Sequence, residues 1–96
     1  MFAFAYAIKS YLNPLVALQV AQQTLANSGF QIFDVAQPGK VTVGGTHPGA
    51  GILVTAVSID CEGGSATVIN AFCTHQSAAA SAQQMAEMVY ATIQAS

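Results

Sequence analysis

Two apolar segments in the second half of the chain, residues 52–60 and 65–74, constrain its fold more than any other feature. Only the four residues Cys61-Glu62-Gly63-Gly64 separate them. Branched and aromatic side chains favour strands, and a short connection that contains glycine favours an antiparallel hairpin. The sequence therefore predicts that these two segments pair as neighbouring long strands.

The first of these segments is apolar on both sides. Because side chains alternate between the two faces of a strand, each face can be considered separately. One face carries Ile52, Val54 and Ala56, and the other carries Leu53, Val57 and Ile59. A sheet that is apolar on both faces needs cover on both, and two helices on one side cannot give it. We therefore expect something outside this chain to cover the second face.

The N-terminal segment, residues 2–8, alternates large apolar side chains with alanine. This period of two predicts a strand whose alanine side lies close against another part of the structure. A helix is the alternative for this segment, because its large side chains also fall at helical spacing.

Two helices are expected. The first begins at Asn13-Pro14, where asparagine caps and proline suits the first helical position, and ends near Ser28-Gly29. Its apolar residues lie on two sides, which indicates that it contacts more than a sheet. The second runs from Ser77 to about Ala95, and one face carries Ala78, Ala82, Met85, Val89 and Ile93.

Two shorter strands, residues 30–36 and 40–43, are expected between the first helix and the hairpin. Proline followed by glycine suits the centre of a type II turn, so Gln37-Pro38-Gly39 connects them. The sequence thus predicts a single α+β domain, residues 1–96, in the order β-α-β-β-β-β-α. Its antiparallel sheet has four to five strands, and both helices pack on one face.

The glycine-rich stretch 44–51 reads GGTHPGAG and resembles a phosphate-binding loop only in part. Ala50 and Gly51 stand where a P-loop has lysine and a hydroxyl residue, and a dinucleotide fingerprint would have glycine in place of Val54. A strand rather than a helix follows, so no helix N-terminus is present to hold an anion. We expect this stretch to be a turn between strands.

Charged residues make up only 6% of the chain, whereas about 25% is typical of soluble domains. Two lysines and a net charge of −2 cannot neutralise a phosphate backbone, which excludes nucleic-acid binding. No apolar run reaches the roughly 20 residues of a membrane-spanning helix. A surface with little charge repels its own copies weakly, so we expect self-association, most simply as a homodimer.

One group of residues could form a ligand site. In the predicted hairpin, the start of the first strand lies beside the end of the second, which brings His47 near Cys73 and His75 where the last helix begins. These three residues could bind a metal such as zinc or copper through nitrogen and sulfur, or Cys73 could act as a nucleophile. Alternatively, His47 lies in an exposed loop, His75 lies near a helix cap and Cys73 is a small buried apolar residue.

Cys61 and Cys73 lie at opposite ends of the predicted hairpin, too far apart for a disulfide. Free thiols favour a reducing compartment such as the cytoplasm, although the neutral surface rich in Gln and Thr argues against it.

The sequence thus favours a non-enzymatic, self-associating binding or assembly module that requires no cofactor. The alternative is a small-ligand or metal-binding protein that uses His47, Cys73 and His75. No carboxylate, hydroxyl or lysine forms a recognisable catalytic set with either histidine.

Overall fold

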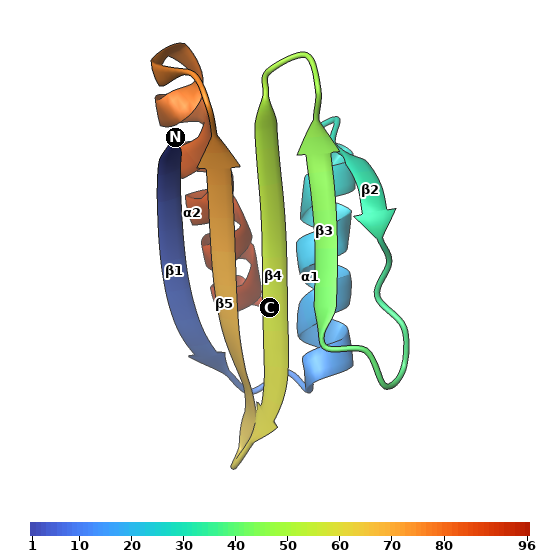
Figure 1. Cartoon of the computed structure of the whole chain (residues 1–96). Coiled ribbons are helices and arrows are strands. Elements are labelled where there is room, and N and C mark those ends of the chain that lie inside the picture. The colour runs from blue at the N-terminus through green and yellow to red at the C-terminus, as the bar shows by residue number, and fades with distance from the viewer.

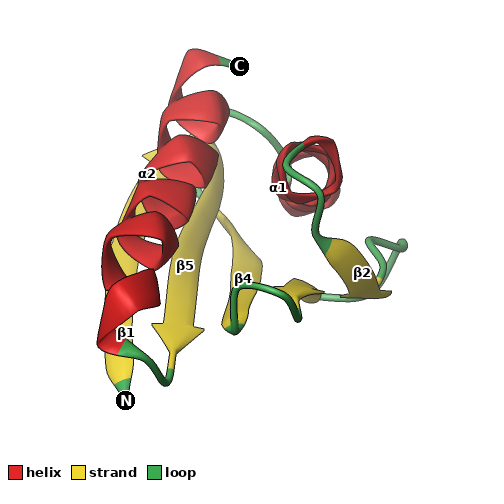
Figure 2. Cartoon of the chain, turned by 90° about the horizontal axis from the view of Figure 1, so that it is seen from above, coloured by secondary structure: helices red, strands yellow, loops and turns green.

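Five antiparallel strands form one sheet, and two helices lie on the same side of it (Figures 1 and 2). The structure is a computed structural model that describes residues 1–96. The elements in chain order are β1 (Phe2–Ser10), α1 (Pro14–Asn27), β2 (Gln31–Asp34), β3 (Thr42–His47), β4 (Ile52–Cys61), β5 (Gly64–Cys73), a 3₁₀ turn (Gln76–Ala78) and α2 (Ala79–Ala95). The strand order is β1-β5-β4-β3-β2. This arrangement confirms the predicted class, element order and placement of both helices.

The predicted hairpin is formed by β4 and β5. Its register runs from Ile52 opposite Cys73 to Cys61 opposite Gly64, which leaves a connection of two residues, Glu62-Gly63, rather than four. The two cysteines are therefore about 30 Å apart at roughly 3.3 Å per strand residue, and both are free thiols.

Residues 2–8 form a strand, as predicted, but the prediction that its alanine side is the covered one was wrong. The large side chains of β1 face the helices, where the Tyr6 ring lies 6.1 Å from that of Tyr90 in α2. The alanines Ala3, Ala5 and Ala7 are exposed. Aromatic side chains bury more area than alanine, so they occupy the covered face and leave the alanines outside.

The start of α1 follows the local sequence, whereas α2 begins at Ala79, two residues after the predicted Ser77, because a 3₁₀ turn precedes it. The Asn13 side chain accepts a hydrogen bond from the Val16 N–H at 2.9 Å and caps α1. The first helix packs on α2 as well as on the sheet, which accounts for its two apolar sides. The predicted apolar face of α2 is buried. Neither helix has the length and hydropathy needed to cross a lipid bilayer.

The predicted boundaries of β3 were wrong. Gly44, Gly45, Thr46 and His47 continue the strand, and only Pro48 to Gly51 form the turn to β4. Both glycines leave space for β2 side chains rather than forming a turn. A Cβ on Gly44 would lie 2.5 Å from Cζ of Phe33, and one on Gly45 would lie 3.2 Å from Cδ1 of Ile32. The β2 side chains thus pack directly on the β3 backbone.

The core lies between the sheet and the helices. Its largest fully buried side chains include Leu18, Leu25, Val54, Ile69 and Val89. The buried Ser58 hydroxyl is hydrogen-bonded to the Thr67 hydroxyl at 2.9 Å, so this polar pair is satisfied without water. All of this packing uses only one face of the sheet.

Candidate functional site

The face of the sheet opposite the helices has no cover within the chain (Figure 1). We call it the open face. The strand registers place its side chains in three rows: Ala3, Phe72, Leu53 and Thr46; Ala5, Asn70, Thr55 and Gly44; Ala7, Val68, Val57 and Thr42. Ala66 and Ile59 extend the face beyond the third row, and Ile59 is 55% exposed. The second apolar face predicted for the hairpin is therefore present and is exposed.

Phe33 enlarges this apolar surface. The pairing of β2 with β3 shifts by one residue between Ile32 and Asp34, and Phe33 is the extra residue of the bulge. Its ring lies over Gly44 and is 59% exposed. Sequence reasoning did not assign Phe33 to this surface, because only the contact with Gly44 shows on which face the bulge places it.

Few charges lie on the open face, and those few are at its margins. Lys9 stands at one end of β1, opposite Ala66. At the β2 margin, the Lys40 ammonium forms an ion pair with Asp34, and the Thr42 hydroxyl donates to the same carboxylate at 2.6 Å. The hydrogen bond from Lys40, followed by that from Thr42, holds the pKa of Asp34 below its ordinary value of 3.8. The centre of the face carries only apolar and neutral polar groups.

His47, Cys73 and His75 lie near one end of the sheet, as predicted, but not as one cluster. His47 on β3 and Cys73 on β5 both pair with Ile52 on β4, which lies between them. Their backbones are therefore two strand spacings, or about 10 Å, apart. The Nδ1 of His47 accepts a hydrogen bond from the Ala50 N–H at 3.2 Å, and its ring packs edge-on against Phe30. The buried Cys73 thiol donates to the His75 carbonyl at 3.5 Å.

The separation of His47 from Cys73 bears on the alternative prediction of a metal-binding protein. No group of three or more His, Cys, Asp or Glu side chains in the structure is placed to hold a metal ion. Tetrahedral zinc needs its nitrogen and sulfur ligands within about 2.3 Å of the metal, and the Ile52 side chain lies between His47 and Cys73. A ligand or metal site at these three residues stays a prediction.

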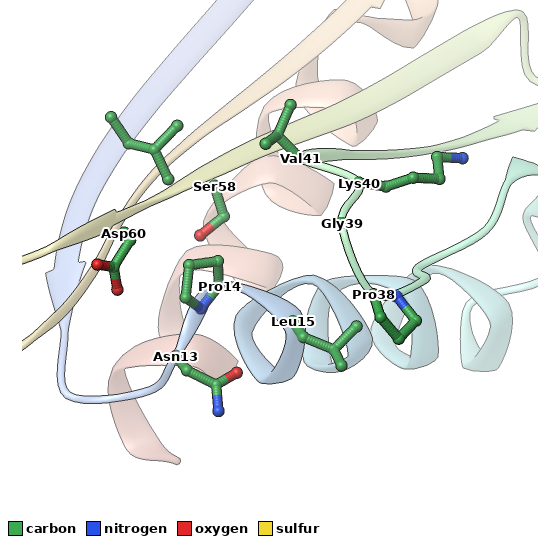
Figure 3. Close-up of a pocket in the computed structure, with 10 residues that line it drawn as sticks. Asn13, Pro14, Leu15, Pro38, Gly39, Lys40, Val41, Ser58 and Asp60 are labelled. Carbon is green, nitrogen blue, oxygen red and sulfur yellow. The ribbon is translucent and has the colours of Figure 1, made fainter.

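The largest cavity, of about 580 Å³, lies at the opposite end of the sheet (Figure 3). Asn13, Pro14 and Leu15 at the start of α1 line one wall, and residues 38–41 and the end of β4 line the others. The Ser58 hydroxyl in this cavity is bonded to Thr67 rather than to a base. Ser58 is the only residue lining this cavity that has a hydroxyl, so no hydroxyl nucleophile with an adjacent base lies there.

A second cavity, of about 300 Å³, lies between α2, the residues that follow α1 and the ends of β3 and β4, and it contains His47. Its apolar lining includes Phe30, Ile52, Met85 and Met88. None of these residues was predicted to accompany His47, because their meeting depends on how α1 and α2 pack.

Comparison with protein-family models, with curated proteins and with solved structures finds no match for this chain.

Proposed function

We propose that this protein is a non-enzymatic self-associating module in which two copies pack through their open faces as a homodimer. The observation that carries the proposal is the uncovered apolar surface of the sheet, centred on Val57 and Val68 and extended by Phe33. Burying apolar surface is the main driving force of association, and it needs no specific charge pair.

The size of the open face supports this proposal. β4 and β5 are ten residues long, β1 nine, β3 six and β2 four, and each strand residue covers about 16 Å² at roughly 3.3 Å rise and 4.8 Å strand spacing. The projected area is about 600 Å², close to the roughly 800 Å² that each partner buries in a stable complex. Two such sheets would pack face to face about 10 Å apart, as in a β-sandwich.

A second copy is the occupant that fits the chemistry of this surface. The centre of the face lacks charge, so two copies meet without unpaired ions. Thr42 and Thr46 on β3, and Asn70 in the middle row, can hydrogen-bond to the copy. Lys9 and the pair of Asp34 with Lys40 lie at the margins, where they remain hydrated. An acidic or basic partner would find no complementary potential here.

Light scattering coupled to size-exclusion chromatography tests the proposal at tens of micromolar protein. The wild-type mass should be at least that of a dimer. Val57→Lys places a charge at the centre of the open face and should lower the assembly mass, because a buried unpaired charge is strongly unfavourable.

Gln19→Lys is the matched control, since it adds the same charge at an exposed position of α1. This variant should keep the wild-type mass. A wild-type protein that elutes as a monomer at this concentration would contradict the proposal. So would a Val57→Lys variant that is folded and has the wild-type mass.

A further inference from the structure

The outer edge of β1 has free backbone groups. The Ser58 N–H donates to the Val41 carbonyl, so the even-numbered residues of β4 direct their backbone groups toward β3. The odd-numbered residues of β4 therefore bond to β5, and the odd-numbered residues of β5 bond to β1. By the same alternation, the odd-numbered residues of β1 direct their backbone groups away from β5. They are Ala3, Ala5, Ala7 and Lys9, and no hydrogen bond in a turn or loop ends on them.

The other edge of the sheet, formed by β2, has features that hinder pairing with another strand, whereas the β1 edge lacks them. At that edge β2 has only four residues and contains the bulge at Phe33. Pro38 follows shortly after, and the Gln22 side chain accepts the hydrogen bond of the Ala36 N–H. Short length, bulges and proline are among the features by which proteins prevent edge pairing. β1 has nine residues, no bulge and no proline, and Lys9 is its only charge.

We propose that β1 pairs with the β1 strand of a second copy, antiparallel and about a two-fold axis at Tyr6. This register places Ala5 opposite Ala7 of the copy and Ala3 opposite Lys9. It uses every free backbone group of the edge, in about eight hydrogen bonds. The result is a continuous sheet of two copies with the helices of both on the same side.

The side chains of β1 suit its own copy. On the open face, small alanines meet alanines, so the surface continues flat across the junction. On the helix face, Phe4 meets Ile8 of the copy, and aromatic with β-branched pairs stabilise neighbouring strands. The two Lys9 side chains lie about 20 Å apart at roughly 3.3 Å per residue, so they do not repel each other strongly.

The position of α2 also fits this pairing. The helix packs on both β1 and β5, at the edge of the sheet. Pairing of the edges would therefore bring the two α2 helices close to each other across the junction. Gln83, Glu87 and Tyr90 form the flank that would face the copy, since Gln84 and Met88 lie on the flank toward α1.

This contact is separate from the face-to-face contact proposed above, and together the two interfaces would build an assembly larger than a dimer. Residue-resolved amide hydrogen exchange of the wild-type protein tests the edge directly. The amides of Phe4, Tyr6 and Ile8 are bonded to β5 in every state and serve as the reference. Those of Ala3, Ala5, Ala7 and Lys9 should become protected as protein concentration rises, by at least tenfold in exchange rate.

Ala5→Pro removes one outward N–H without breaking a bond to β5, and proline is tolerated at such edge positions. The variant should have a lower assembly mass than Ala5→Ser, which keeps the N–H, and combining it with Val57→Lys should give a monomer. Free exchange of the four outward amides at concentrations where the protein is associated would overturn the edge pairing alone. Protected outward amides with no effect of Val57→Lys would overturn the face contact alone.

Discussion

At the scale of single residues, the ionisation of Asp34 at the margin of the open face depends on two neighbouring hydrogen-bond donors. Lys40 and Thr42 both donate hydrogen bonds to it, and these bonds stabilise the ionised form. The pKa of Asp34 is therefore lower in the folded protein than its ordinary value of 3.8. Because the ionised form is favoured on folding, this carboxylate contributes to stability only while it is ionised.

The sign of the pH dependence follows. The contribution of Asp34 is fully present above pH 3.8, and it is lost as the pH falls from that value through the lower pKa of the folded state. Urea unfolding between pH 6 and pH 2, at one protein concentration, should show a stability loss in wild type that Asp34→Asn largely lacks. Asp60→Asn is the control, since its carboxylate makes no hydrogen bond to another side chain. An unchanged profile in Asp34→Asn would show that the ion pair does not form.

At the scale of elements, Gly64 determines how the connection from β1 to α1 passes the end of the hairpin. Its φ is +150°, and a Cβ at this position would overlap the carbonyl oxygen of Ser10 and lie 2.8 Å from Cα of Tyr11. Both are backbone atoms, so no side-chain rotation can relieve the overlap. The chain after β1 can approach β5 only because residue 64 has no side chain.

We therefore expect Gly64→Ala to lower the free energy of unfolding by about 3 kcal/mol or more, from overlap and backbone strain together. Gly39→Ala is the matched control: its φ is +85°, but no atom lies within 4 Å of the added Cβ. It should cost only about 1 kcal/mol of backbone strain. Urea unfolding at one protein concentration measures both. Equal losses would mean that the Ser10 contact is absent.

The same elements show how much the sequence could predict. Branched and aromatic side chains and the short connection identified β4 and β5, and Asn13-Pro14 with Ser28-Gly29 marked the ends of α1, because these are local signals. The extension of β3 through Gly44 and Gly45 was not predictable, since Phe33 and Ile32 occupy the space of the missing side chains. Long-range contacts of this kind leave no local pattern.

The candidate site also has some features that the sequence predicts and others that depend on long-range pairing. The apolar second face of β4 was readable from Leu53, Val57 and Ile59, because alternation alone assigns side chains to faces. The free edge was not readable, because it depends on β1 lying beside β5 at the end of the strand order. The separation of His47 from Cys73 by Ile52 likewise depends on the register of three strands.

At the scale of the whole molecule, the open face is not the result of loose folding. The accessible surface is 5152 Å², and a compact monomer of 9.8 kDa is expected to expose about 5,200 Å². The chain is thus as compact as an ordinary monomer, yet the helices cover only one face of its sheet and leave the open face uncovered. Its low charge, 6% of residues, leaves little repulsion to keep copies apart.

Association driven by apolar burial has a distinct thermodynamic signature. Because the proposed assembly would compete with unfolding by mass action, the apparent Tm should rise with protein concentration, by roughly 4 °C per tenfold increase for a domain of this size. Sodium chloride between about 0.1 and 1 M should change this dependence little, since few charges are present to be screened. Differential scanning calorimetry at several concentrations and salt levels measures both effects. Val57→Lys should show a weaker concentration dependence and Gln19→Lys the wild-type one. A wild-type Tm independent of concentration, or an assembly that sodium chloride dissociates, would mean that the apolar face of the sheet does not bring the copies together.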